Sequence, residues 1–166
     1  KDHYDSKNGL NRVHHRACAA DIANGGIEEL LRDKLRVDGD DISKVLEVLK
    51  INFVLICDCF KAYSTKCDSL QCLSLNTFTE FALDCEIIDH DQCSLGAMDT
   101  IFIHANLRQK PISFAEKQFS GVVIKNTKHL MQRFQFLIAI IRIAYAKNGG
   151  ISMQRGPLSD ALTALF

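Results

Sequence analysis

The residues of this chain best suited to chemistry are its cysteines, and their spacing does not form a convincing metal site. They are Cys18, Cys57, Cys59, Cys67, Cys72, Cys85 and Cys93. A zinc site needs ligands close enough to close a tetrahedron, usually two pairs spaced C-x(2–4)-C or H-x(3–5)-H. The nearest approach to this spacing is the set Cys57, Cys59, Cys67 and Cys72. Cys57 and Cys59, however, lie two residues apart in a helical pattern, so their side chains point to different faces of the helix. The pattern favours free thiols that pack as small apolar residues in a reducing compartment, with a metal site or disulfides as alternatives.

The histidines do not complete an enzyme active site. His14 and His15 lie in a polar segment typical of solvated surface. His90, near Asp89 and Cys93, suggests a Cys/His nucleophile, but such a pair also needs an orienting group and an oxyanion donor, which one short loop rarely provides. Gly149 and Gly150 follow a predicted helix, so they indicate a helix end and not a phosphate-binding loop. We therefore predict that the chain is not an enzyme and carries no cofactor.

The acidic residues near position 90 are the nearest candidates for a metal site. A twelve-residue calcium loop takes oxygen ligands at positions 1, 3, 5 and 12, the last from a bidentate Glu. A loop starting at Asp89 has Asp91 at position 3, but Cys93 at position 5 and Thr100 at position 12. Because most of the oxygen ligands are missing, we predict no bound metal, with Asp89 and Asp91 as the weak candidates.

Composition narrows the remaining classes of function. The chain has 166 residues, 47% of them apolar and 24% charged, which is typical of one globular domain. Its net charge is zero, but residues 1–100 are acidic overall whereas residues 101–166 are basic. No dense Lys/Arg run is present, so we expect no nucleic-acid partner. No apolar run approaches the roughly 18–20 residues of a membrane helix, so we expect no membrane span.

The periodicity of the apolar residues predicts an all-α fold. We expect a polar arm over residues 1–11, helices within 12–36 that break at Asn24–Gly26, and a long apolar helix from about Asp41 to Ala62. Asp40 or Asp41 is the expected cap of that helix. A helix that opens with a Thr77/Glu80 capping box is expected next, followed by a helix after Ser94 and an insertion at about 107–129. The last expected elements are a helix over Gln132–Lys147, which ends at Asn148–Gly150, and a final turn after Pro157.

Several segments resemble an EF-hand-like domain of the calmodulin superfamily, found in proteins of flagellated protists and in ciliary proteins. The resemblance is carried by Asn76–Phe81, Met98–Ile103, Met131–Phe136 with Ile141–Ala144, and Leu158–Leu162. The resemblance covers about residues 60–166 and implies an EF-hand-like domain with degenerate calcium loops over 67–166, which follows the arm and helices expected over 1–66. Within that domain, the expected helix pair covers about 75–106 and 130–147.

The resemblance implies a non-catalytic structural component of a large cytoskeletal assembly, in the axoneme of a cilium or flagellum. Its partners are then other proteins, including microtubule-associated ones, and its location is the cytoplasm. The alternatives are a calcium-responsive sensor and an accessory subunit of another organellar complex. We expect Phe134, Leu137, Ile138 and Ile141 to line a groove for a partner helix. The alternative role for these four residues is the core of the chain itself.

Overall fold

The computed structural model describes residues 6–67, 71–89, 92–107, 130–150 and 156–166, with the backbone alone for residues 6–11. These residues are mostly helical, which confirms the all-α prediction. The elements are α1 (Ser6–Gly25), α2 (Ile27–Glu29), the π-helical turn η1 (Leu30–Lys34), α3 (Gly39–Ile51), α4 (Phe53–Ser64), β1 (Leu73–Ser74), α5 (Leu75–Asp84), α6 (Leu95–Asn106), β2 (Leu130–Met131), α8 (Arg133–Lys147) and α9 (Leu158–Thr163).

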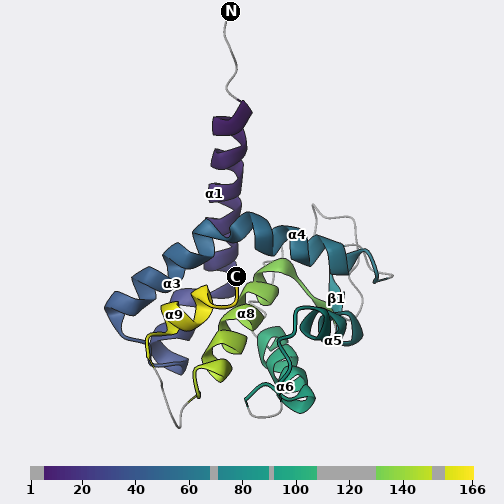
Figure 1. Ribbon diagram of the computed structural model, residues 1–166. Helices are drawn as coiled ribbons and strands as arrows, with labels where there is room; N and C mark the ends of the chain where they lie inside the picture. The colour runs from purple at the N-terminus through teal and green to yellow at the C-terminus, as the bar shows by residue number, and fades with distance from the viewer. Residues whose placement is uncertain (1–5, 68–70, 90–91, 108–129, 151–155) are drawn as a thin grey trace, which may run out of the picture.

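Helix α8 lies at the centre of the molecule, and the other helices cover it (Figure 1). The C-terminal part of α1, together with α4, α6 and α9, packs directly against α8, while α3 lies beside α9. Every residue from Gln135 to Ile141 is buried. A helix that is apolar almost all round must be covered on all sides, so α8 sets the positions of its neighbours.

An aromatic cluster joins α8 to α4 and α5. The ring of Phe136 lies 5.7 Å from that of Phe60 and 5.0 Å from that of Phe81, with the second pair edge to face. Phe78 contacts the same cluster and reaches Phe102 on α6, at 5.6 Å. Such tilted and edge-to-face pairs add stability beyond the area that they bury. The cluster therefore fixes α4, α5 and α6 around one end of α8.

The single long helix predicted up to Ala62 is wrong, because the chain breaks at Asn52 into α3 and α4. The side-chain amide of Asn52 donates a hydrogen bond to the carbonyl oxygen of Val48, at 3.0 Å. An asparagine that satisfies a backbone carbonyl in this way competes with helix continuation. The two helices consequently have different neighbours: α3 packs on α9, and α4 packs on α5 and α8.

Both ends of the N-terminal segment differ from the expectation. Helix α1 begins at Ser6 and not at residue 12, and the rest of the predicted arm lies outside the described residues. Asp38, not Asp40 or Asp41, is the residue before α3 that caps it, through the backbone N–H of Asp40. The breaks at Asn24–Gly26 and at Asn148–Gly150 are confirmed, and Gly26, Gly149 and Gly150 have positive φ angles that suit glycine.

Asp41 caps a helix that lies far away in the sequence. Its carboxylate accepts hydrogen bonds from the backbone N–H groups of Leu158 and Ser159, at 2.7 and 3.3 Å, and from the Ser159 hydroxyl. These groups form the start of α9, where backbone N–H groups have no partner within the helix. The first turn of α3 thus holds the C-terminal helix in place.

The predicted boundary at residue 66 falls just after α4 and does not separate two cores. One continuous cluster of buried apolar residues runs from Cys18 in α1 to Leu162 in α9. Residues 108–129, nearly all of the predicted insertion, lie outside the described residues. The described helices therefore form one packed unit.

The N-terminal segment is attached to α8 by an ion pair between Asp21 and Arg133. The two nitrogens Nε and Nη2 of Arg133 donate to the two carboxylate oxygens of Asp21, at 2.5 and 3.1 Å. The Asp21 side chain is 8% exposed and that of Arg133 is 39% exposed. The guanidinium also lies 5.7 Å from the centre of the Phe53 ring. This contact connects α1, α4 and the first turn of α8.

We expect Arg133→Met to lower the free energy of unfolding by about 2–3 kcal/mol, because Asp21 is left as a buried charge without its partner. Urea unfolding of the wild type, Arg133→Met, Asp21→Asn and the double variant measures the coupling. The double variant should lose clearly less than the sum of the two single losses. Losses that simply add would contradict a direct coupling between these residues.

Candidate functional site

The two short strands join the loops that precede α5 and α8. They pair antiparallel, with Leu73 opposite Met131 and Ser74 opposite Leu130. Each strand leads directly into a helix, and each of these helices begins with a capping box. At α5 the box joins Ser74 and Thr77, and at α8 it joins Gln132 and Gln135. The described residues therefore contain two similar units in which a short strand leads directly into a capped helix, β1–α5 and β2–α8.

This pairing corrects two details of the sequence prediction. The paired strands lie before α5 and before α8, whereas Asp89 and Ser94 lie between α5 and α6. The cap of α5 is Ser74 with Thr77, not Thr77 with Glu80, because the helix begins three residues earlier than the pattern suggests. The cap at Ser94 is confirmed by the hydrogen bond from the Ala97 N–H, at 3.3 Å.

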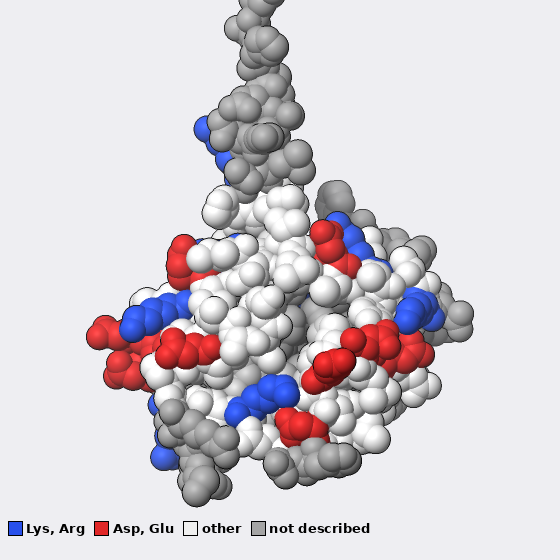
Figure 2. All heavy atoms as spheres, viewed as in Figure 1, with Lys and Arg blue, Asp and Glu red and all other residues white. Residues whose placement is uncertain are grey.

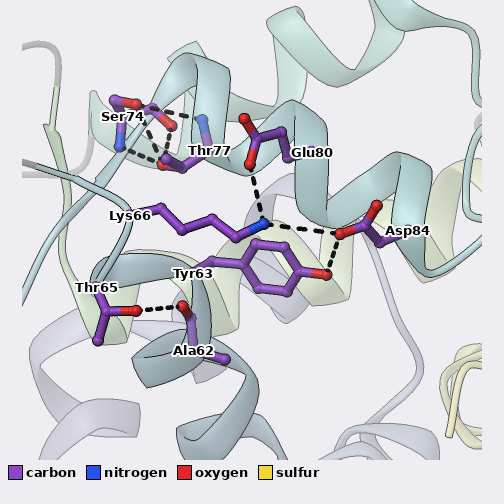
Figure 3. Close-up of polar contacts among 8 residues, drawn as sticks. All are labelled: Ala62, Tyr63, Thr65, Lys66, Ser74, Thr77, Glu80 and Asp84. Carbon is purple, nitrogen blue, oxygen red and sulfur yellow. Dashed lines mark hydrogen bonds and ion pairs between the residues drawn. The ribbon is translucent and has the colours of Figure 1, made fainter.

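A lysine ammonium sits beside the acidic side chains of the first unit (Figure 3). The Nζ atom of Lys66 lies 3.1 Å from Glu80 Oε2 and 3.9 Å from Asp84 Oδ2. It also lies 4.8 Å from the centre of the Tyr63 ring. The Tyr63 hydroxyl donates to the same oxygen of Asp84, at 2.8 Å. Burial and this hydrogen bond raise the pKa of Tyr63 to about 12.

The predicted metal candidate Asp89 is engaged by protein groups. Its Oδ1 accepts hydrogen bonds from the backbone N–H groups of Gln92 and Cys93, at 2.6 and 2.8 Å, and its Oδ2 lies 3.1 Å from Nζ of Lys147. The two backbone hydrogen bonds, followed by the lysine, hold the pKa of this carboxyl well below its usual range. Asp91 and His90 lie outside the described residues. Within the described part of the chain, no three His, Cys, Asp or Glu side chains gather as a metal site would require.

The four residues predicted to bind a partner helix are placed mostly in the core. Leu137, Ile138 and Ile141 have no exposed surface, and only Phe134 is partly exposed. In this conformation these three residues belong to the core of the chain and do not line a groove for a partner helix. A partner could reach these three residues only if the helices around α8 moved apart.

An apolar groove of about 360 Å³ opens at the surface between α4, α5, α8 and the end of α9. Its walls include Leu55 and Cys59 from α4, Phe81 and Cys85 at α5, Ile140 and Ile143 from α8, and Leu165 and Phe166 at the C-terminal end. Glu86 and Lys147 are the charged residues that line it. Figure 2 shows the groove face from the front, with uncharged surface across its centre and charged side chains around it.

The groove has an open apolar edge. Leu55 is 48% exposed and Phe166 is 42% exposed. Ile51 and Val54, close to Leu55 in the sequence, are exposed as well. The apolar character of this segment can be read from the sequence. The groove, however, depends on α9, whose position no local pattern indicates.

Comparison of the chain with protein-family models, with curated proteins and with solved structures finds no match. Among the described helices, none is both long and apolar enough to cross a membrane.

We expect Asp89→Asn to lower the free energy of unfolding at neutral pH by about 1 kcal/mol, because it removes the charge that Lys147 and the two backbone N–H groups stabilise. The pKa of Asp89 is lower in the folded chain than its ordinary 3.8. Its contribution is therefore complete above about pH 4 and is lost as the pH falls further. Urea unfolding at several pH values should show the difference from wild type shrinking in acid.

Asp99→Asn, at an exposed position of α6, is the matched control for this measurement. A stability difference for Asp89→Asn that stays constant from neutral pH down to acid would contradict the assignment.

Proposed function

We propose that this chain is a non-catalytic protein-binding module, built from a pair of EF-hand-like units, that serves as a structural part of a larger assembly. The arrangement α4–β1–α5 and α6–β2–α8 supports the proposed pairing, since Leu73 and Met131 meet across the two loops just before the second helix of each unit. The observation that carries the functional proposal is the exposed apolar groove.

The first of the two loops can be compared with a calcium loop position by position. In a twelve-residue loop that begins at Lys66, the sixth residue is Gln71 and the twelfth is Thr77. Gln71 has a φ of 69°, the left-handed conformation for which such a loop normally uses glycine. A lysine takes the place of the first carboxylate, and a threonine takes the place of the bidentate glutamate. These substitutions support a scaffold and disfavour a calcium sensor.

The groove suits a protein partner. Its lining is largely apolar, and the exposed leucine, valine and isoleucine side chains beside it extend the apolar surface beyond the cavity. Exposed apolar surface of this kind costs solubility unless a partner covers it, and apolar grooves accept the anchoring side chains of partner helices. We therefore assign partner binding to the groove around Leu55 and Phe166, and not to the buried residues Leu137, Ile138 and Ile141.

The cellular setting of the proposal comes from the sequence resemblance. It is the axoneme of a cilium or flagellum, where the partners are other proteins of the assembly, including microtubule-associated ones. The groove by itself suits an accessory subunit of a different large complex equally well. The identity of the proteins that co-purify with the full chain from its own cells distinguishes these settings.

We expect Leu55→Asp to prevent incorporation of the full chain into its native assembly, because a carboxylate placed in the apolar wall must be desolvated when a partner binds. Incorporation is measured as the fraction of tagged chain that sediments with the assembly from native cells. Ile103→Asp is the matched control, since Ile103 is 54% exposed on α6 and does not line the groove. Circular dichroism should show both variants folded. Equal incorporation of Leu55→Asp and wild type would contradict the groove assignment, and turnover of a small molecule by the purified chain would contradict the non-catalytic proposal.

We expect no calcium binding at micromolar concentrations, because the first loop lacks most of the oxygen ligands that such affinity needs. Titration calorimetry of the full chain, together with the fluorescence of its three tyrosines in the absence of tryptophan, checks this. Magnesium at the same concentration controls for non-specific charge effects. A saturable calcium signal that magnesium does not reproduce would favour the sensor alternative.

A further inference from the structure

Two cysteines from different helices line the same groove. Cys59 comes from α4 and Cys85 is the C-terminal cap of α5, and both contribute to the wall of the 360 Å³ cavity. Cys59 is partly exposed and Cys85 is exposed, so a small reagent can reach them from the groove. By contrast, Cys18, Cys57 and Cys93 are buried.

Contacts around Tyr63 bring the two cysteine-bearing turns together. Tyr63 lies one helical turn after Cys59, and its hydroxyl donates to the carboxylate of Asp84, the residue before Cys85, at 2.8 Å. The Tyr63 ring also packs edge to face on Phe81, with the ring centres 5.5 Å apart. These contacts hold the end of α5 against the last turn of α4, one turn beyond Cys59.

Cys59 lies near enough to affect the titration of Cys85. Burial raises the pKa of the Cys85 thiol first, and the neighbouring Cys59 raises it further. Burial and Asp58 raise the pKa of Cys59. Because the thiolate is the reactive form, both thiols react slowly at neutral pH, and their oxidation state should follow the surrounding redox buffer over long times.

We propose that Cys59 and Cys85 form a thiol–disulfide exchange site that accepts a small-molecule disulfide of the glutathione class and closes to a disulfide across the groove wall. The thiolate of one cysteine attacks a sulfur of glutathione disulfide, forming a mixed disulfide and releasing one glutathione thiolate. The thiolate of the other cysteine then attacks the protein sulfur of that mixed disulfide and releases the second glutathione. The two protein thiols lose two protons and two electrons in total, and glutathione disulfide is reduced to two glutathiones.

The bond would alter the proposed partner site. It would tie α4 to the end of α5 at the groove wall to which both cysteines contribute. If the disulfide narrows the groove, apolar side chains and ligands should bind in it less tightly. This consequence rests on the proposed function, whereas formation of the disulfide does not.

The test begins with the fully reduced full-length chain, incubated with glutathione disulfide and analysed as intact protein by mass spectrometry. Wild type should lose two hydrogens, and the reaction should speed up about tenfold per pH unit below the thiol pKa. The control Cys67→Ser/Cys72→Ser, which removes a second pair of partly exposed thiols, should form the same bond. Cys59→Ser and Cys85→Ser should each stop at a mixed disulfide with glutathione. A disulfide that survives in Cys59→Ser or in Cys85→Ser, or that disappears in the control, would overturn the proposal.

Binding of the dye 8-anilinonaphthalene-1-sulfonate to the groove measures the consequence. Oxidation should weaken dye binding by about tenfold in wild type and leave the double variant Cys59→Ser/Cys85→Ser, which has neither thiol, unchanged. Dye binding that is equal in the oxidised and reduced wild type would overturn the closing of the groove. Reduced Leu55→Asp should lose dye binding, which shows that the dye binds in this groove. Failure to form the disulfide appears in the mass of the protein, whereas failure of the partner site appears in the dye and incorporation measurements.

Discussion

The structure depends on the burial of α8. Because this helix is apolar on nearly every side, it is stable only when several other helices cover it together, and α1, α4, α6 and α9 do so. The first turn of α8 contains one charged residue, Arg133, which forms an ion pair with Asp21. The packing of α8 thus determines which elements become neighbours, and the ion pair fixes the direction in which α1 leaves the body.

Lysine side chains pair with the carboxylates around α5. Lys66 supplies a positive charge to Glu80 and Asp84, and Lys147 supplies one to Asp89. Both contacts are made within the chain and need no metal ion, which agrees with the proposed role as a structural module.

The groove remains because α9 covers α8 only in part. Asp41 holds the start of α9, and the last residues of the chain then run along one wall of the groove, leaving Phe166 partly exposed. The apolar surface that results is bordered by two accessible thiols. The proposed partner site and the proposed thiol exchange therefore share one wall of the groove, to which α4 and α5 both contribute.

The sequence by itself determined the helical class and many of the helix ends. Apolar periodicity and caps such as Ser94 and Asn148–Gly150 act over a few residues, so a local pattern is sufficient to predict them. It did not predict the break at Asn52, because the apolar stripe continues through that position. It placed the first loop at Asp89, since acidic residues suggested a metal, while the real loops pair through Leu73 and Met131.

Only the tertiary structure decided the site. The caps of α9 come from Asp41, up to 118 positions away, and the groove combines residues from α4, α5, α8 and the C-terminal end. The spacing of Leu137, Ile138 and Ile141 is compatible with a groove or with a core. These residues belong to the core because the neighbouring helices bury them. Local propensity specifies a helix and its apolar face, but only the competition among all such faces for burial specifies which surface stays open.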